Sequence, residues 1–352
     1  MTGDRIPAQA REKLITHHSS LITAQYRAPW WLPGGHAQTI YAALASPRPR
    51  VAYRRERWET PDSDFVDLDW TDAQSVVSRQ PPAVSVPLVV LFHGLEGSSR
   101  SHYAQALMAA ARDRGLRGVT VHFRGCSGEP NRLPRAYHSG DAAEIDWVLR
   151  RLRSGNPGTR LYAAGVSLGG NALLKWLGES GASARQVVDR ATSVSAPLDL
   201  MAAGDALGRG FSRAYAWHFL RTLRQKSLVK LDRFPGLFDA ARVRAAFTLR
   251  EFDDIVTAPL HGYRDTDDYW TRASSKPGLA RIRVPTLVLN ARNDPFLPAT
   301  SLPGRNAVSS AVTLEQPDEG GHAGFVSGPF PGNLDWMPQR LLEFFGAGAE
   351  KL

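Results

Sequence analysis

Short, continuously apolar segments alternate with longer helical segments in the first half of the chain, and this alternation limits its fold more than any other feature. The apolar runs cover residues 86–92, 118–123, 160–164 and 191–194, and the helical segments cover residues 101–114, 141–153 and 168–179. A strand that is apolar along its whole length is buried on both faces, and a helix between two such strands lets them run parallel. The pattern predicts an α/β fold with a mostly parallel central sheet flanked by helices.

The segments on either side extend this sheet. Residues 54–60 and 65–71 flank a turn of Pro, Asp, Ser and Asp, which predicts an antiparallel hairpin. Two later strands are expected at residues 285–290 and 312–316, followed by a final helix at residues 337–345.

We expect one core domain built from residues 51–200 and 277–352. Residues 1–50 contain paired tryptophans and a Pro-Gly-Gly turn, which predict an extended N-terminal arm packed on this core. Residues 201–276 are rich in arginine and aromatic residues and contain helices without clear strands. They predict a helical cap inserted over the C-terminal edge of the strands, where ligands bind in open α/β sheets.

The composition limits the cellular setting. Apolar residues make up 43% and charged residues 22% of the chain, as in a packed globular protein. A single cysteine, Cys126, excludes an intramolecular disulfide and a cysteine zinc cluster, and it favours a reducing, cytoplasmic location. The first residues lack the apolar stretch of a signal peptide, and no apolar run is long enough to span a membrane. We therefore expect neither secretion nor a transmembrane anchor.

The chain carries a formal net charge of +9 with histidines neutral. Most of the excess is arginine scattered along the sequence. No basic run is interleaved with aromatic residues, and no zinc-finger or helix-turn-helix spacing occurs, so we expect no nucleic-acid partner.

The sharpest motif is GVSLGG at residues 165–170, between an expected strand and an expected helix. A nucleophile elbow turns so tightly at this junction that its flanking positions require glycine, while the serine oxygen projects above the sheet edge. In a chain with 31 glycines, a simple strand-to-helix turn is the alternative. The strand before the motif and the helix after it favour the elbow, with Ser167 as the nucleophile.

A serine hydroxyl needs a base to take its proton as it attacks. Ten histidines compete for this role. His322 lies in EGGHAGF, just after the last expected strand, where a loop can bring the imidazole over the nucleophile. A surface-loop histidine is the alternative interpretation of this position.

The third member should be a carboxylate that orients the imidazole. Asp294 lies in NARNDPFLP directly after the strand 285–290 and completes the order Ser, Asp, His expected of an elbow fold. Asp199, after the preceding strand, is the rival candidate. Asp318 and Glu319 are expected to be solvated loop residues.

A tetrahedral intermediate needs backbone N–H donors, one after the nucleophile and one from the loop after an earlier strand. We assign these roles to Leu168 and to Leu95, which follows His93 and Gly94 after the strand 86–92. His93 is expected to shape this loop and not to act as a base. Cys126, in HFRGCSGEPN, is expected to be a small residue in a tight glycine loop and not a nucleophile.

Several long motifs in order resemble the YheT-like branch of the α/β-hydrolase superfamily (AB hydrolase 4 family), which is related to mammalian ABHD1/ABHD3-type and yeast Eht1-type proteins. The matching segments are PWWLPGGHAQTI, FHGLEGSSRSHY, HFRGCSGEPN, YHSGD, GVSLGGNALLKWLGE, FDDIVTAPLHGYRDTDDYW, VPTLVLNARNDPFLP and GGHAGF. The Gly-Gly-His of the first segment departs from the asparagine-histidine pair that relatives often carry. The resemblance implies hydrolysis of carboxylic esters or thioesters, often with medium-chain or lipid-like acyl groups, and places Ser167, Asp294 and His322 on the family's triad positions.

Together these features predict a serine esterase that acts on a small-molecule acyl ester through an acyl-enzyme on Ser167, without metal or cofactor. Two alternatives stay open. An acyltransferase would use the same acyl-enzyme with an alcohol as acceptor, and a non-catalytic binding protein could keep the hydrolase fold.

Residues 208–226 interleave aromatic and apolar residues with arginines. The aromatic and apolar residues are Phe211, Tyr215, Phe219 and Leu223, and the arginines are Arg209, Arg213, Arg221 and Arg224. Such a stripe favours a helix packed on its core. The alternative is a basic amphipathic face that makes peripheral contact with an anionic membrane surface through the cap.

Overall fold

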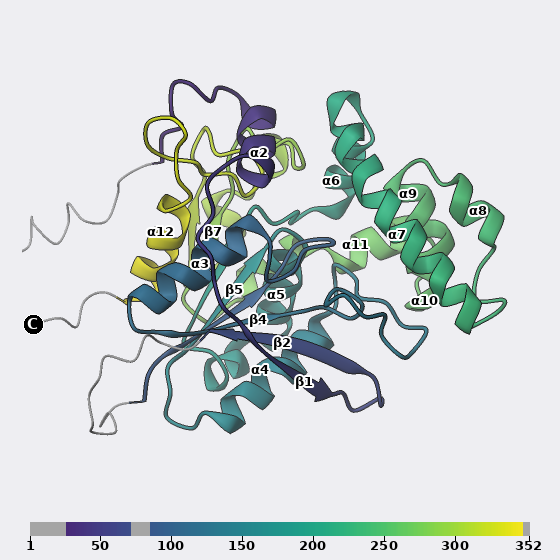
Figure 1. Ribbon diagram of the computed structural model, residues 1–352, viewed down its shortest axis with the longest axis horizontal. Helices are drawn as coiled ribbons and strands as arrows, with labels where there is room; N and C mark the ends of the chain where they lie inside the picture. The colour runs from purple at the N-terminus through teal and green to yellow at the C-terminus, as the bar shows by residue number, and fades with distance from the viewer. Residues whose placement is uncertain (1–25, 72–84, 348–352) are drawn as a thin grey trace, which may run out of the picture.

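A computed structural model of the chain describes residues 26–71 and 85–347 (Figure 1). Its centre is an eight-stranded sheet with the order β1-β2-β4-β3-β5-β6-β7-β8. The strands are β1 (Arg54–Glu59), β2 (Phe65–Thr71), β3 (Leu88–Phe92), β4 (Arg117–Val121), β5 (Leu161–Val166), β6 (Arg190–Val194), β7 (Thr286–Leu289) and β8 (Val312–Glu315). The predicted mostly parallel sheet is confirmed.

The predicted hairpin forms the antiparallel end of this sheet. β1 pairs with β2, β2 pairs antiparallel with β4, and all the other pairs are parallel. The strands β3 to β8 therefore end at one edge, where Phe92 lies beside Gly165 and Val166 beside Val194. The loops after these strands carry the residues that the sequence selects as functional.

Helices cover both faces of the sheet, so its central strands are buried on both sides. On one face, α3 (His102–Asp113) and α12 (Trp336–Phe344) pack against Val89 and Leu91 of β3. On the other face, α4 (Ala142–Gly155) and α5 (Leu168–Ser180) pack against alternate residues of the same strand. A short 3-10 helix, η1 (Gly181–Gln186), follows α5, and two more, η5 (Ala299–Ser301) and η6 (Arg305–Ala307), lie between β7 and β8.

The described part of the predicted N-terminal arm, residues 26–50, is not extended throughout, which corrects that part of the sequence prediction. It contains the helix α2 (Gly35–Leu44), which starts after Gly34 turns the chain with a φ of 81°. The residues that follow include alanine, glutamine and leucine, which favour a helix once the turn has started it. Ala42 of α2 packs with Leu32, Ala106 and Val326. Residues 1–25 of the predicted arm, including the stretch examined for a signal peptide, lie outside the described residues.

Between β6 and β7, the structure describes every residue and contains helices and turns but no strand. We call residues 200–281 the helical insertion; Figure 1 shows most of its helices grouped to the right of the sheet. Its elements are α6 (Leu200–Leu207), η2 (Gly210–Ser212), α7 (Arg213–Arg233), α8 (Ala240–Ala245), α9 (Leu249–Phe252), the π-helix η3 (Asp253–Thr257), α10 (Ala258–Leu260), α11 (Thr266–Ala273) and η4 (Lys276–Arg281).

The aromatic stripe predicted on residues 208–226 faces mainly inward. Tyr215 and Phe219 pack against Phe296, and Leu223 packs in the core of the insertion, whereas Phe211 is exposed. The stripe is therefore mostly a packing face, because burying these side chains removes apolar surface from water. None of the helices in the described part of the chain has the length and apolar character needed to cross a membrane.

Candidate active site

Ser167 occupies a strained turn between β5 and α5. Its φ of 53° and ψ of −122° are unusual for a residue with a side chain, and such strain persists only where the surroundings hold it. The Ser167 N–H donates to the carbonyl of Val194 at 2.8 Å, and the Gly169 N–H donates to the carbonyl of His93 at 3.1 Å. These bonds fix the serine at the edge where the parallel strands end.

Two glycines of the motif are required by close backbone contacts. A Cβ on Gly165 would lie 2.5 Å from the carbonyl oxygen of Gly169, and a Cβ on Gly169 would lie 2.4 Å from that of Phe92. Both distances are far shorter than any van der Waals contact allows. The glycines therefore let α5 start directly against the sheet, as the elbow interpretation of the sequence predicts.

The structure brings together the three residues that the sequence selects from distant positions. His322 Nε2 lies 2.9 Å from Ser167 Oγ. His322 Nδ1 lies 2.9 Å from Asp294 Oδ2 and 3.2 Å from Oδ1. The side chain of Asp294 is 2% exposed and that of His322 is 10% exposed, so the chain of hydrogen bonds is largely shielded from water.

Asp294 and His322 are each held by a further contact. The backbone N–H of Phe296 donates to Asp294 Oδ1 at 2.8 Å, which leaves the carboxylate oriented toward the imidazole. The ring of Phe296 stacks on that of His322, with centroids 3.9 Å apart and planes 15° from parallel. The imidazole therefore has one face covered and both nitrogens directed along the Ser–His–Asp line.

The loop that carries His322 is held by side chains from three other parts of the fold. Thr39 of α2 accepts a hydrogen bond from the His322 N–H at 2.8 Å, and Ser195 accepts one from the Ala323 N–H at 2.9 Å. His102 of α3 contacts the Ala323 carbonyl through Nε2 at 2.8 Å. Burial lowers the pKa of His102 to about 4, so its ring is neutral near pH 7 and Nε2–H is the donor.

The sequence does not predict that α2 helps to hold this loop. The buried Gln38 accepts hydrogen bonds from the Gly320 N–H at 2.9 Å and from Asn293 Nδ2 at 3.0 Å. A Cβ on Gly35 would lie 1.9 Å from the carbonyl oxygen of Asn293, so the Gly-Gly-His variation allows α2 to lie directly against the loop after β7. The only signal in the sequence was the unusual length of the motif PWWLPGGHAQTI.

The rival acids lie elsewhere. Asp199 caps α6 by accepting from the Ala202 N–H at 3.2 Å and pairs with Lys276 at 3.4 Å. Asp318 has a side chain that is 85% exposed and lies 3.7 Å from Arg292. Glu319 is partly exposed, and none of its hydrogen bonds or ion pairs among the described residues reaches His322.

His93 is engaged through both ring nitrogens, as expected of a loop-shaping residue. Nδ1 lies 2.7 Å from the Gly94 carbonyl, and Nε2 accepts from the Phe123 N–H at 3.1 Å. Burial lowers the pKa of His93 to about 3, so the ring remains neutral. With both nitrogens occupied, His93 has no position free to accept a proton from substrate.

Leu95 and Leu168 are the residues that the sequence assigns as oxyanion donors. A Cβ on Gly94 would lie 3.0 Å from Ser167 Cβ, so the loop after β3 passes directly beside the nucleophile. Tyr103 accepts a hydrogen bond from the Gly94 N–H at 2.8 Å and fixes this loop. Hydrogen bonds among the described residues do not use the N–H of Leu95 or of Leu168, and both residues line the same cavity as Ser167.

This cavity has a volume of about 510 Å³ and lies between the sheet edge and the helical insertion. The insertion contributes most of its apolar wall. The wall includes Leu200, Leu207, Phe219, Leu223, Phe252, Val256 and Trp270. A cavity of this size and polarity suits a ligand with a sizeable apolar part.

One end of the cavity is polar and fastens α7 to the core. Lys226 contacts Glu96 at 2.9 Å and Cys126 Sγ at 3.6 Å, and Tyr137 donates to Glu96 at 2.8 Å. Lys230 donates to Asn131 Oδ1 at 2.7 Å and to two backbone carbonyls of the loop after β4. Because these contacts cross from the insertion to the core, they close this end of the cavity.

Burial sets the chemistry of two groups at this end. It raises the pKa of the Cys126 thiol to about 12, so the thiol stays protonated and is a poor nucleophile near pH 7. It lowers the pKa of Lys230 to about 8. Among residues 26–71 and 85–347, no group of three or more His, Cys, Asp or Glu side chains is arranged to hold a metal ion.

The sheet, the elbow and the Ser–His–Asp hydrogen bonds together define the class of an α/β hydrolase. Residues 87–329 match the family model described as the alpha/beta hydrolase fold. Solved structures agree on the fold. Est1E from Butyrivibrio proteoclasticus, solved with ferulic acid, is 14% identical with a TM-score of 0.52, covering 86% of this chain and all of that one. The esterase PF2001 of Pyrococcus furiosus is 15% identical with a TM-score of 0.52, covering 86% of this chain and 97% of that one.

Curated relatives place the chain more closely. It is 39% identical over 308 residues to YheT of Escherichia coli (strain K12), whose name carries a provisional esterase assignment; the match covers 87% of this chain and 88% of that protein. It is 30% identical to Phospholipase ABHD3 of Mus musculus over 98% of this chain and 84% of that protein. The chain therefore belongs to the α/β-hydrolase fold family, in its YheT-like branch. These esterase- and lipase-type relatives support ester hydrolysis.

Proposed function

We propose that this protein is a serine hydrolase that cleaves carboxylic esters through an acyl-enzyme on Ser167. The observation that carries the proposal is the position of His322, with Nε2 2.9 Å from Ser167 Oγ and Nδ1 2.9 Å from Asp294. An imidazole held between a hydroxyl and a buried carboxylate can take the hydroxyl proton during attack and share the resulting charge with the carboxylate. These are the requirements for activating a serine.

The proposed reaction has two stages. Ser167 Oγ attacks the ester carbonyl carbon while its proton moves to His322 Nε2, and Asp294 stabilises the imidazolium. The N–H groups of Leu95 and Leu168 bind the oxyanion of the tetrahedral intermediate. His322 then gives the proton to the leaving alcohol, which departs from the acyl-enzyme. Water attacks this acyl-enzyme with the same base, and the acid leaves as Ser167 regains its proton.

The apolar wall of the cavity supports an ester with a medium-chain or lipid-like acyl group or the corresponding thioester. Burying each methylene contributes about 0.8 kcal/mol, so the insertion can select for chain length. The names of two relatives are consistent with such substrates: Phospholipase ABHD3 of Mus musculus, and Monoacylglycerol lipase of Saccharomyces cerevisiae, which is 30% identical over 68% of this chain. In this proposal residues 201–276 act as the substrate cap. The single Cys126 supports a reducing, cytoplasmic location.

Turnover of p-nitrophenyl esters from acetate to palmitate tests the proposal. The Ser167→Ala variant is expected to keep its fold and lose several orders of magnitude in kcat/KM on every ester. Cleavage by Ser167→Ala at the wild-type rate would overturn the proposal. No turnover by wild type on any ester would favour the binding-protein alternative, and ester exchange in the presence of an added alcohol would identify acyl transfer.

A further inference from the structure

Helix α7 separates the active-site cavity from solvent and presents a different surface to each. Its inner side contributes Phe219 and Leu223 to the cavity wall. Its outer side, with the turn before it, exposes Phe211 and Trp217, whose exposed fractions are 58% and 56%. Large aromatic residues exposed to this extent mark a candidate surface for an apolar partner.

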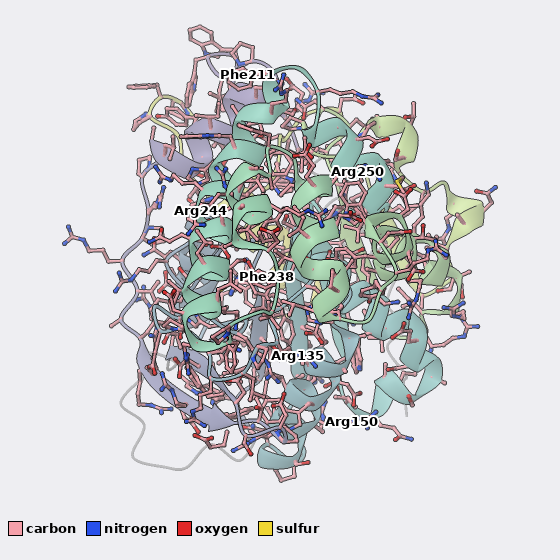
Figure 2. The ribbon with its side chains drawn as sticks, turned by 90° about the vertical axis from the view of Figure 1, so that its right-hand side faces the viewer. Arg135, Arg150, Phe211, Phe238, Arg244 and Arg250 are labelled. Carbon is pink, nitrogen blue, oxygen red and sulfur yellow. The ribbon has the colours of Figure 1, made fainter. Side chains whose placement is uncertain are left out.

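Exposed arginines neighbour these aromatic residues along the chain. We define the basic face as Arg209, Phe211, Arg213, Trp217, Arg221 and Arg244. The guanidinium of Arg221 lies 5.9 Å from the centre of the Trp217 ring. Arg244 of α8 lines a surface hollow of about 560 Å³ together with Arg221 and Arg224. Figure 2 looks onto the insertion and labels Phe211 and Arg244.

The charge of the insertion is divided unevenly between its helices. Helix α7 carries six basic residues and one acidic residue, Asp232, which also lines the hollow. Most acidic residues of the insertion lie on α6 and between α9 and α11. These are Asp205, Glu251, Asp253, Asp254, Asp265, Asp267 and Asp268.

The cations of the basic face are not neutralised within the described part of the chain. Arg209, Arg213, Arg221 and Arg244 form no ion pair with any described carboxylate. Arg250 of α9, by contrast, contacts both Asp205 and Asp267. The basic face therefore carries an unbalanced positive charge next to exposed aromatic rings.

The basic face also adjoins the active-site cavity. Gln225 and Val229 of α7 line both the outer hollow and the cavity that contains Ser167. Both residues are exposed at the surface. An acyl chain that reaches α7 from outside at this point would lie beside the apolar cavity wall.

We propose that the basic face docks on the surface of an anionic lipid bilayer. The arginines bind the lipid phosphates. Phe211 and Trp217 insert at the boundary between the hydrated headgroups and the apolar acyl chains. A nucleic-acid duplex would satisfy the charge, but its paired bases are stacked inside the helix and would leave the two aromatic rings without an apolar partner. The docking itself does not depend on the proposed esterase activity.

Co-sedimentation with vesicles tests the docking. The probes are vesicles of pure phosphatidylcholine and vesicles in which a quarter of the lipid is phosphatidylglycerol. Wild type and Ser167→Ala are expected to bind the anionic vesicles equally, to bind less at high salt, and to bind pure phosphatidylcholine weakly. Loss of binding in Ser167→Ala alone would contradict docking through this face, and the test is independent of whether the enzyme is active.

Two double variants address the face itself. Arg213→Gln/Arg221→Gln is expected to lose about 25-fold in vesicle affinity, because each basic residue near an anionic surface contributes about fivefold. Phe211→Ser/Trp217→Ser is expected to lose about tenfold or more, since it removes the inserted apolar area. Both should hydrolyse a water-soluble ester at the wild-type rate, because none of the four residues lines the active-site cavity.

Matched variants on other surfaces serve as controls. Arg150→Gln/Arg185→Gln removes the same charge far from α7, and Phe330→Ser removes another exposed aromatic residue, 72% exposed. Both controls are expected to bind as wild type. Equal losses in the controls and in the α7 variants would overturn the proposal, as would absence of binding to anionic vesicles at low salt. Binding of duplex DNA without binding of vesicles would also overturn it in favour of a nucleic-acid surface.

Discussion

Thr39 Oγ1 accepts a hydrogen bond of 2.8 Å from the backbone N–H of His322 and itself donates to the Gly35 carbonyl at 2.7 Å. The residue is 6% exposed, so water does not readily replace either bond. A helix near the start of the described chain therefore helps to fix the imidazole that lies against Ser167. The position of the proposed base depends on a segment that is remote from it in sequence.

The substitution Thr39→Val tests this positioning role. It removes the acceptor for a largely buried N–H, an interaction whose loss costs about 1–3 kcal/mol, so kcat is expected to fall about 10- to 100-fold with little change in KM. Thr39→Ser keeps the hydroxyl and should retain most of the activity. Steady-state kinetics on a short-chain p-nitrophenyl ester would check both, and equal impairment of the two variants would show that the hydroxyl is not what matters.

A comparison of two aspartates tests the acid. Asp294→Asn is expected to lower kcat by about 10³- to 10⁴-fold, because an amide cannot stabilise the imidazolium. Asp199→Asn keeps an N-cap on α6 and should be close to wild type in rate. Comparable losses in the two variants, measured by kcat, would mean that the hydrogen bond between Asp294 and His322 does not serve catalysis.

A third prediction concerns pH and the buried His102. Its pKa is about 4 in the folded protein and about 6.5 in the unfolded chain, so between these values the unfolded chain binds more protons. The contribution of His102 to the free energy of unfolding is fully present above pH 6.5. It decreases as the pH falls toward 4, by about 3 kcal/mol in total. In urea unfolding, the excess of the wild-type free energy of unfolding over that of His102→Gln should become smaller as the pH falls from 6.5 to 4. A gap that is constant with pH would contradict the assignment.

The elbow gives a prediction about stability. Gly169→Ala places a methyl group against the carbonyls of Phe92 and His93, and the expected cost is about 3 kcal/mol or more together with loss of activity. Gly155→Ala is the matched control, since a Cβ there meets no atom within 4 Å and alanine favours a helix. Urea denaturation of both variants would decide. A Gly169→Ala protein of normal stability would show that α5 can move away from the sheet.

The sequence predicted the sheet and the assembly of Ser167, Asp294 and His322, because these depend on local patterns. Apolar runs show where strands are buried, and a loop directly after such a strand must emerge at the sheet edge. The fastening of the His322 loop by Gln38 and Thr39 was not predictable in this way. It depends on a contact between segments about 280 residues apart in the chain.

The helical insertion illustrates the same limit. The alternation of aromatic residues and arginines on residues 208–226 indicated a helix but not which side faces inward. Packing against Phe296 of the core selects Tyr215 and Phe219 for burial and leaves Trp217 outside. The direction of α7 is set by Lys226, whose partner Glu96 lies on the loop after β3, and by Lys230, whose partner Asn131 lies on the loop before α4.

The most direct test of the account is labelling with a fluorophosphonate probe followed by peptide mass spectrometry. The probe reacts with an activated serine, so we predict one phosphonylated site, Ser167, in wild type and in Cys126→Ala, and strongly reduced labelling in His322→Ala. Labelling at another residue, or equal labelling of wild type and His322→Ala, would contradict activation of Ser167 by His322.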